Sequence, residues 1–554
     1  MRRILKVSDL TKIYWDSQVP PDWTGNHLDE LRTVPEESSF TRTTNHQETL
    51  EFISKLAWRS EHIHIERLFI SDLRRISPLV ILSNPRVTTP EEAKETGKPI
   101  VYLQGNIHPP EAEGKEALLM LMRDIATGEK SYYLDHMIIL VAPDFNPDGT
   151  ETWEVKNTST FSGTPHIQSL RHNAVDADVN RDSIKMETVN MQGLYMNVLN
   201  KWDPVMTLDL HSMGRVQHGY CNLYAPSYTP TGNPGPREYT QYTVLPWIRE
   251  YGKKQFGAMF HTHADYDWEK WPPEIWDPVA GGYSVEAKFI VNAIGLRNRM
   301  SILTETPGHV GFEKRIWACY TFTLCLLDYL EEKGDEIVRV CKEADDQVVS
   351  DVLMKAEMGE LRNWVMGEYS EQSEKIDLYA YKGRTEDIIP GTSIIRHYIG
   401  EGEPEFIKGV TDLTKPVGTK DAIVPRGYFF YEELKGVAEK LRDHGVTVTK
   451  LGEPVTVEGY EFIVDEFREV KKGWIRLYEM TELRGGWFKT IKTYPDGSYH
   501  VDMAQPLANV AFYCLEPEVG DGLMGWNYFN GYLKSRGAET NSVVFPVFKY
   551  LKTL

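Results

Sequence analysis

Short apolar runs recur in the first 340 residues and alternate with longer, helix-like stretches. The runs lie at Pro99–Gly105, His136–Ala142, Val205–Leu210 and Met300–Thr304. Strands that are apolar on both faces are typical of a sheet covered by helices on both sides, and such sheets are largely parallel. Helical patterns at Glu111–Ile125 and Ile316–Glu332 supply two of these helices. The alternation therefore predicts an α/β domain.

The two ends of the chain differ from this α/β part in residue composition. Residues 1–38 are polar and contain several prolines, which predicts an N-terminal arm. From about residue 365 the chain is rich in Gly, Pro and β-formers, with a hairpin signal at Tyr494–Gly497 and an amphipathic helix at Tyr431–His444. We therefore expect an α/β domain over residues 39–345 and a smaller α/β or β-rich accessory domain over residues 346–554.

Composition and charge narrow the classes of function. The chain has 554 residues, of which 41% are hydrophobic and 26% charged, as in ordinary soluble globular proteins. No stretch has about 18 consecutive apolar residues, so we expect no membrane-spanning helix. The 61 basic and 81 acidic residues give a net charge of −20. This balance argues against a nucleic-acid partner, because such proteins usually carry a basic patch.

The cysteines and the start of the chain bear on its compartment. The five cysteines are few, odd in number and without metal-site spacing, which predicts reduced thiols and no disulfide framework. The basic start, Met1–Lys6, is followed by polar residues and by no apolar run of signal-peptide length. As written, the sequence predicts a cytoplasmic protein, and a secreted one stays open if the start is trimmed.

The first candidate chemistry follows the strand that ends at Gly105. His108 and Glu111 form an HxxE pair, and Pro109 and Pro110 forbid a helix through His108. The pair therefore sits on a turn, from which an imidazole nitrogen and a carboxylate oxygen can both reach a zinc ion at about 2.0–2.2 Å. Taken alone, an HxxE pair is a weak pattern that more often marks an ordinary surface turn than a metal site.

Two more strands place polar side chains at the same predicted edge of the sheet. His211 follows one apolar run and Glu305 closes another. Open α/β sheets bind ligands in the crevice beyond the carboxyl ends of their strands. Two histidines and one glutamate form the three-ligand set of a hydrolytic zinc site, and a second glutamate is suited to act as general base on its water. A core histidine and an exposed strand-end glutamate are the simpler alternatives.

Basic residues lie between these positions along the chain. Asn180 and Arg181 are neighbours, and a guanidinium beside an amide can hold a carboxylate. Arg171, nine residues before Asn180, is placed to polarise a carbonyl group. Taken singly, each arginine is equally explained as a surface cation.

Together these segments resemble the zinc carboxypeptidase family of the carboxypeptidase A type, also called funnelins. The resemblance is carried, in order and spacing, by Gly105-Asn-Ile-His108-Pro-Pro-Glu111-Ala-Glu-Gly-Lys-Glu-Ala117, Asn146-Pro-Asp-Gly149, Asn180-Arg181-Asp182, Leu208-Asp-Leu-His211, Gly295-Leu-Arg-Asn-Arg299 and Leu303-Thr-Glu305. The region after about residue 350 resembles the C-terminal extension of long bacterial members at Gln505-Pro-Leu507, Leu515-Glu-Pro517 and Trp526-Asn-Tyr-Phe529.

The resemblance implies a fold, a cofactor and a catalytic base. The fold is a three-layer α/β/α catalytic domain around a mixed, largely parallel sheet of eight strands. The cofactor is one zinc ion per chain, held by His108, Glu111 and His211. Glu305 is the implied general base and later the proton donor to the leaving amine, and Arg171 is implied to polarise the scissile carbonyl and to steady the oxyanion.

The resemblance also implies how the substrate is held. Asn180 and Arg181 would bind the free C-terminal carboxylate of a peptide or peptide-like substrate. The family usually offers a tyrosine to the substrate, and Tyr283, 22 residues before Glu305, is the candidate, with a packed loop aromatic as the alternative.

Two features depart from the family pattern. Pro109 and Pro110 fill a gap that usually holds small residues or glycine, which would tighten the turn without moving the ligands. The segment Glu286–Ile290, expected to line the pocket for the last side chain, matches poorly. Lys288 there would favour acidic C-terminal residues and Ile290 apolar ones, while a solvent-facing Lys288 is the simpler expectation.

We therefore expect a zinc-dependent metallocarboxypeptidase that hydrolyses the C-terminal amide bond of peptides with zinc-activated water. A zinc amidohydrolase acting on an acyl amino acid or a peptidoglycan stem peptide would need the same residues. An inactive binding homologue is a weaker alternative, because neither a ligand nor the base has been lost. For the accessory domain, Trp487, Phe488 and Trp526 suggest either an aromatic binding platform or its core.

Overall fold

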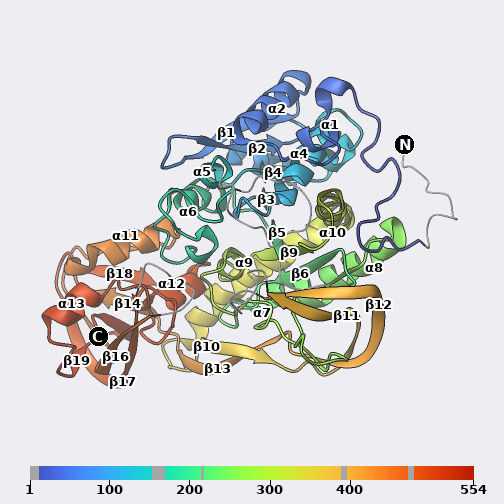
Figure 1. Ribbon diagram of the computed structural model, residues 1–554. Helices are drawn as coiled ribbons and strands as arrows, with labels where there is room; N and C mark the ends of the chain where they lie inside the picture. Colours follow the sequence, from blue (N-terminus) through green and yellow to red (C-terminus); the bar gives the residue numbers. More distant parts are fainter. Residues whose placement is uncertain (1–11, 153–168, 214–217, 388–395, 472–478) are drawn as a thin grey trace.

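The computed structural model describes residues 12–152, 169–213, 218–387, 396–471 and 479–554 (Figure 1). Its α-helices are α1 (Val34–Glu37), α2 (His46–Arg59), α3 (Pro90–Thr96), α4 (Glu113–Ala126), α5 (Pro147–Thr150), α6 (Val189–Leu194), α7 (Pro234–Tyr239), α8 (Leu245–Phe256), α9 (Ile290–Gly295), α10 (Phe312–Lys355), α11 (Lys435–Asp443), α12 (Ala508–Leu515) and α13 (Asn530–Ser535). Short 3-10 or π turns lie at Asp29–Leu31, Ser131–Asp135, Val179–Arg181, Tyr195–Leu199, Thr240–Val244 and Glu432–Leu434.

The strands fall into two groups along the chain. Those of the first part are β1 (Ile63–Ile70), β2 (Ile76–Leu82), β3 (Ile100–Gly105), β4 (Ile138–Ala142), β5 (Met206–Met213), β6 (Asn222–Pro226), β7 (Phe260–Thr262), β8 (Ile275–Trp276) and β9 (Met300–Pro307). Those after α10 are β10 (Arg362–Ser370), β11 (Ile376–Asp387), β12 (Arg396–Asp412), β13 (Lys415–Ile423), β14 (Gly427–Phe430), β15 (Thr449–Lys450), β16 (Val455–Lys471), β17 (Glu479–Tyr494), β18 (Tyr499–Asp502), β19 (Val543–Val544) and β20 (Val547–Thr553).

A mixed sheet of eight strands forms the centre of the first part. Its order is β1-β2-β4-β3-β5-β9-β6-β7. The pairs β3–β4, β3–β5, β5–β9 and β6–β7 are parallel, and the pairs β1–β2, β2–β4 and β6–β9 are antiparallel. The predicted α/β fold with a mixed, largely parallel sheet is confirmed.

Helices cover both faces of this sheet. Val101 and Leu103 of β3 face an apolar cluster that includes α2, α4 and α10, whereas Tyr102 between them faces a cluster that includes α6 and α9. This alternation follows from the two-residue period of a strand. All residues of α4 are buried, because the helix lies between the sheet and its neighbours α2 and α10. The sheet is therefore the middle of three layers.

The last helix of the first part joins two helical stretches that the sequence pattern predicts separately, Ile316–Glu332 and Asp335–Trp364. α10 runs without a break from Phe312 to Lys355 and ends before Trp364. Gly334 interrupts the sequence pattern, yet a glycine costs a helix only about 1 kcal/mol. A Cβ atom at Gly334 would lie 2.9 Å from Cγ of Pro99, so the glycine allows close packing at this point. The helix runs past residue 345, and the domain limit expected there stays a prediction.

The chain beyond α10 is rich in strands, as expected. A seven-stranded sheet contains β14 to β20, while β10 pairs with β13, and β12 pairs with β11 and with β8 of the first part. The hairpin expected at Tyr494–Gly497 is wrong in its pairing. β17, which precedes the turn, pairs with β16, whereas β18, which follows it, pairs with β14 and β15. The turn residues specify a chain reversal but not the partner of each strand.

The aromatic residues proposed as a binding platform do not share one surface. Trp526 is buried in the apolar core of the C-terminal region and Trp487 packs against that core, whereas Phe488 is 55% exposed. The five cysteines are buried and free. Of the predicted N-terminal arm, residues 1–11 lie outside the described residues, and the Tyr14 N–H donates to the Gly257 carbonyl at 3.1 Å.

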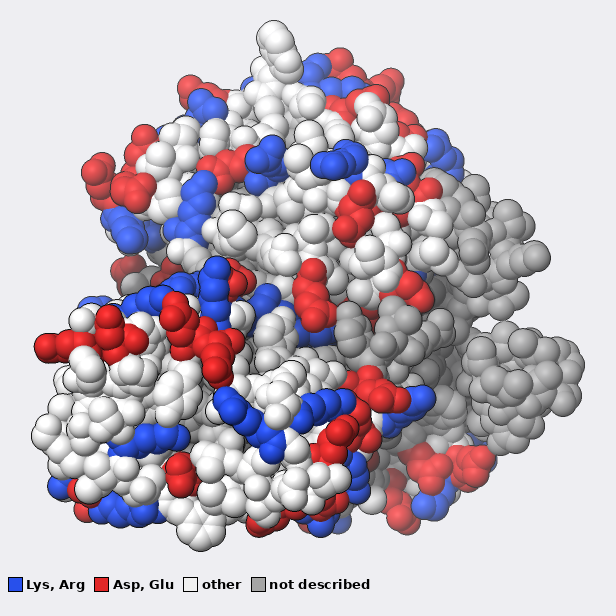
Figure 2. Space-filling model, turned by 90° about the vertical axis from the view of Figure 1, so that its left-hand side faces the viewer, with Lys and Arg blue, Asp and Glu red and all other residues white. Residues whose placement is uncertain are grey.

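Charge is spread over the molecular surface. On the face drawn in Figure 2, acidic and basic side chains are interspersed over the described residues. The excess of 20 acidic groups is not gathered into one patch on this face.

No helix of the described residues is both long and apolar enough to cross a membrane.

Close packing between α4 and β5 gives a first prediction. A Cβ atom at Gly114, the second residue of α4, would lie 2.6 Å from Cβ of Leu210. We expect Gly114→Ala to lower the free energy of unfolding by about 1–3 kcal/mol, because the core cannot expand locally. Gly436, the second residue of α11, is the matched control because nothing lies within 4 Å of its Cβ position.

Thermal unfolding followed by circular dichroism measures both variants. Gly436→Ala should leave the midpoint unchanged or raise it slightly, since alanine favours a helix by up to about 1 kcal/mol over glycine. An unchanged midpoint for Gly114→Ala would contradict the close packing of α4 on the sheet.

Candidate active site

Three neighbouring parallel strands bring the predicted residues to one edge of the sheet. β3 ends just before the turn that carries His108 and Glu111, β5 carries His211, and β9 carries Glu305. His211 and Glu305 are direct partners in the β5–β9 register. Because the three strands run in the same direction and are adjacent, their carboxyl ends meet at the same place.

His108, Glu111 and His211 form a tight, buried group. Nδ1 of His108 lies 3.1 Å from Oε1 of Glu111, and Nδ1 of His211 lies 2.9 Å from Oε2 of the same carboxylate. The donor atoms of the three residues all lie within 4.8 Å of one another. Both imidazole rings thus turn the same kind of nitrogen toward one carboxylate.

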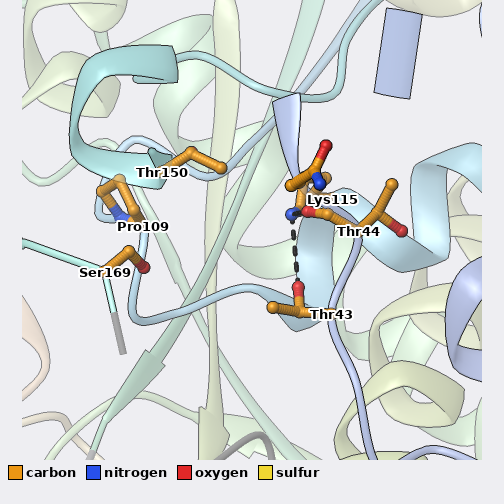
Figure 3. A pocket seen from close by; sticks show the side chains of 7 residues that line it. Thr43, Thr44, Pro109, Lys115, Thr150 and Ser169 are labelled. Carbon is orange, nitrogen blue, oxygen red and sulfur yellow. Dashed lines mark hydrogen bonds between the residues drawn. The ribbon is translucent and has the colours of Figure 1, made fainter. Parts of the chain in front are cut away.

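The two prolines of the HxxE pair are accommodated by a tight turn. The Glu111 N–H donates to the His108 carbonyl at 2.9 Å, so the chain reverses without a helix. Behind the turn, Pro109, Thr43 and Lys115 help to enclose a cavity of about 10 Å³, where Lys115 Nζ donates to Thr43 Oγ1 at 3.2 Å (Figure 3). This space holds about one water molecule, so the outer side of the turn is packed against the residues that precede α2.

Each histidine has an aspartate on its other ring nitrogen. Nε2 of His108 lies 2.9 Å from Oδ1 of Asp178, and Nε2 of His211 lies 2.8 Å from Oδ2 of Asp209. Such carboxylates fix the tautomer and orientation of metal-binding histidines. The sequence analysis assigned no role to either aspartate. Asp209 could have been found, because residues two apart on a strand share a face.

The residues present fit a zinc ion. Nδ1 of His108 is buried and makes no hydrogen bond, although it lies 3.1 Å from Oε1 of Glu111, and a metal ion would relieve this costly state. Burial alone would raise the pKa of Glu111, but His108 and His211 together hold it well below its usual range. The donor set is therefore two imidazole nitrogens and an ionised carboxylate, which is the composition of a hydrolytic zinc site.

Glu305 lies beside His211 on the neighbouring strand, and one of its carboxylate oxygens makes no hydrogen bond. Its Oε2 is buried and has no hydrogen-bond partner. Burial, and then the neighbouring Glu111 carboxylate, raise the pKa of Glu305 to about 8. A carboxylate in this setting binds a proton more readily than an ordinary glutamate, which is the property that a general base requires.

Arg171 contacts both a proposed zinc ligand and the aspartate behind His108. Arg171 Nη1 donates to Glu111 Oε1 at 2.9 Å, and Arg171 Nε donates to Asp178 Oδ2 at 3.2 Å. Burial alone would raise the pKa of Asp178, but His108, Arg171 and Arg181 hold it well below its usual range. The side chain of Arg171 is 42% exposed, so it is accessible from the solvent side of the site.

Asn180 and Arg181 follow on a short 3-10 turn. Asn180 is buried, its side-chain carbonyl accepts from the Ile290 N–H at 3.1 Å, and its amide nitrogen lies 3.4 Å from Nε2 of His211. Arg181 is half-buried and places its guanidinium 4.2 Å from the ring centre of Phe289. The structure thus brings both residues next to the histidine and glutamate group.

Tyr283 and Lys288 are both buried. Tyr283 is buried, its hydroxyl is 3.5 Å from Oδ1 of Asn292, and its ring packs 4.8 Å from that of Phe289. The expectation of a solvent-facing Lys288 is wrong, since its side chain is 5% exposed and pairs with Glu286. Lys288 therefore faces other protein charges.

Comparison with known proteins agrees with this arrangement. Residues 77–313 match the model of the peptidase M14 family, described as zinc carboxypeptidase. The chain thus contains a zinc carboxypeptidase domain, which is a metallopeptidase domain, together with a further region beyond it, and the resemblance inferred from the sequence is confirmed.

The relatives differ in how much of their length is shared. Carboxypeptidase 2 of Trichophyton tonsurans is 24% identical, and the alignment covers 90% of this chain and 88% of that protein. Probable carboxypeptidase 2 of Arthroderma benhamiae is 25% identical, and the alignment covers 57% of this chain but only 60% of that protein. A solved metallo-carboxypeptidase from Pseudomonas aeruginosa, in complex with (2-guanidinoethylmercapto)succinic acid, is 16% identical with a TM-score of 0.36, covering 52% of this chain and 69% of that one.

The aspartates behind the histidines give a second prediction. We expect Asp178→Asn and Asp209→Asn each to weaken zinc binding by about 10–100-fold, because the histidines lose their orienting carboxylates. Competition with a chromophoric chelator measures the affinity. Asp176→Asn is the matched control, since Asp176 lies in the same segment as Asp178 but is exposed and pairs with His172. Equal affinities for Asp178→Asn and Asp176→Asn would contradict the role of Asp178.

Proposed function

We propose that this chain is a zinc metallocarboxypeptidase that removes the last residue from peptides with a free C-terminal carboxylate. The observation that carries the proposal is the buried group of His108, Glu111 and His211, with the unpartnered oxygen of Glu305 beside it. A three-ligand site next to a spare carboxylate is the arrangement that metal-assisted amide hydrolysis requires. The alternative amidohydrolase on a non-protein substrate is not favoured, because the named relatives are carboxypeptidases.

The proposed chemistry divides between the metal and the side chains. A zinc ion held by His108, Glu111 and His211, one per chain, would lower the pKa of its water ligand to about 7. Glu305 accepts a proton from the attacking water through Oε2 and later donates a proton to the leaving amine. Arg171 stabilises the negative charge that develops on the carbonyl oxygen, which is usually the largest catalytic contribution.

Recognition of the free carboxylate is assigned to the neighbouring basic group. Arg181 presents a planar guanidinium, which can bind a carboxylate through two parallel hydrogen bonds. Asn180 is the amide partner at the same turn, and Tyr283 is the proposed aromatic neighbour of the bound substrate. Arg181 follows Asn180, whose amide nitrogen lies 3.4 Å from Nε2 of His211. A positive group next to the zinc ligands in this way would place the last amide bond, and not an internal one, at the site of hydrolysis.

The free carboxylate gives a direct test of the proposed function. We expect zinc-loaded protein to release single C-terminal residues from a peptide mixture and to leave the same peptides intact when their C-termini are amidated. Mass spectrometry follows both sets, with a chelator-treated sample as the control. Equal cleavage of the free and amidated sets would rule out recognition of the carboxylate, and no cleavage of either would overturn the proposed function.

The general base gives a further prediction. We expect Glu305→Gln to lower kcat by about 10²–10⁴-fold, because the amide cannot take the proton from water. Zinc content, measured by atomic emission, should stay at the wild-type level because Glu305 is not among the three ligands. Wild-type turnover in this variant would contradict the proposed mechanism.

A further inference from the structure

The segment that follows Arg181 is held from the other end of the chain. Three consecutive carbonyl groups, those of Ile184, Lys185 and Met186, each accept a hydrogen bond from the C-terminal region. The donors are His444 Nε2 at 2.8 Å, Tyr528 Oη at 2.9 Å and Lys440 Nζ at 3.0 Å, respectively. In Figure 1, α11, which contains Lys440, lies beside α6, which follows this segment.

A second segment on the substrate side is held in the same way. The Ala287 N–H donates to Tyr513 Oη at 2.9 Å, and the Lys288 N–H donates to Asp521 Oδ2 at 2.7 Å. Tyr513 in turn donates its hydroxyl hydrogen to Asp521. These contacts fix the backbone between Tyr283 and Ile290, the stretch whose sequence departs from the family pattern.

The two segments are also joined to each other and to the proposed substrate residues. The Ser183 N–H donates to the Lys288 carbonyl at 3.3 Å, and the Ile290 N–H donates to the Asn180 side chain at 3.1 Å. Arg181 stacks on Phe289, the residue between Lys288 and Ile290. The C-terminal contacts therefore act on the backbone that follows Arg181 and on the backbone that precedes Phe289.

Four of these five contacts with the C-terminal region are buried and the one from Tyr528 is partly buried, which makes them energetically significant. His444, Tyr513 and Asp521 are each less than 5% exposed. Burial lowers the pKa of His444 to about 3, so the ring is neutral and its Nε2 carries the hydrogen that the Ile184 carbonyl accepts. Removing one partner of a buried hydrogen bond leaves the other unsatisfied, which costs more than the bond itself contributes.

The C-terminal contacts are selective for the substrate side of the site. Among the residues that the structure describes, no hydrogen bond joins the part of the chain after β13 to His108, Glu111 or His211. The same region does contact Arg297, whose Nη1 donates to the His444 carbonyl at 2.7 Å. Arg297 belongs to the Gly295–Arg299 motif, for which the proposed chemistry gives no other role.

We propose that the C-terminal region positions the carboxylate-binding side of the active site, with His444, Tyr513, Asp521 and Tyr528 as positioning residues. The inference rests on the proposed function, because it assigns these residues to the recognition of the same free carboxylate. It separates two properties of the enzyme. Substrate affinity depends on the C-terminal region, whereas the zinc ligands and Glu305 are held by the first part of the chain, on β5, on β9 and on the turn after β3.

Kinetics of tyrosine variants of the full-length, zinc-loaded chain test this division. Tyr513→Phe and Tyr528→Phe each remove one hydroxyl that holds a catalytic-domain segment. We expect KM for a free-carboxylate peptide to rise roughly three- to tenfold, with kcat changed by less than about twofold and zinc affinity unchanged. Tyr428→Phe is the matched control, because Tyr428 is buried and its hydroxyl donates to Glu516 within the C-terminal region itself.

Hydrogen exchange provides a readout that does not depend on turnover. We expect faster amide exchange at the segment that each tyrosine contacts, which is residues 287–290 in Tyr513→Phe and residues 183–186 in Tyr528→Phe. Tyr428→Phe should show wild-type exchange in both segments. If Tyr513→Phe does not fold, Tyr528→Phe carries the same test, because Tyr528 is only half-buried.

The outcomes separate the two proposals. Absence of turnover in the wild type would overturn the proposed function, and the exchange data would still decide whether the C-terminal region holds the two segments. Folded Tyr513→Phe and Tyr528→Phe variants with wild-type KM and wild-type exchange would overturn the positioning role. An equal rise of KM in Tyr428→Phe would also overturn it, since the effect would then be general destabilisation.

Discussion

The parallel pairing of β3, β5 and β9 is the constraint on which the site depends. Each strand delivers one part of the chemistry at its carboxyl end, and the hydrogen-bonded register sets the spacing between those parts. His211 and Glu305 are register partners, and the turn with His108 and Glu111 follows the neighbouring strand. Residues separated by nearly 200 positions in the sequence are thus brought together by backbone hydrogen bonds, before any side chain contributes.

Buried charge decides what this edge of the sheet can hold. Four carboxylates lie close together here, those of Glu111, Asp178, Asp209 and Glu305. Desolvation favours the neutral forms of Glu111, Asp178 and Glu305. Histidine and arginine partners keep Glu111 and Asp178 ionised, whereas the Glu305 pKa rises to about 8. A divalent cation compensates such an excess of negative charge, so the same electrostatics that would destabilise an empty polar cluster favours a metal centre.

The molecule divides the tasks of chemistry and recognition between its two parts. The strands β3, β5 and β9 set the positions of the ligand residues, and the C-terminal region contacts the backbone that follows Arg181 and the backbone that precedes Phe289. The long helix α10 leads from the first part toward the second, and β8 of the first part pairs with β12 in a separate three-stranded sheet. Backbone contacts of this kind hold residues 287 and 288 through their N–H groups and not through their side chains.

The sequence by itself determined the four apolar strands β3, β4, β5 and β9, the turn with its two prolines, and the residue types that suit zinc, because these follow from local pattern and from ligand chemistry. It did not determine the pairing of β17 and β18, since a turn specifies reversal but not the partner strand. It also could not bury the Lys288 side chain beside Glu286 or assign Asp178 and Asp209 to the histidines. These outcomes depend on which distant segments pack together, and only the tertiary structure decides that.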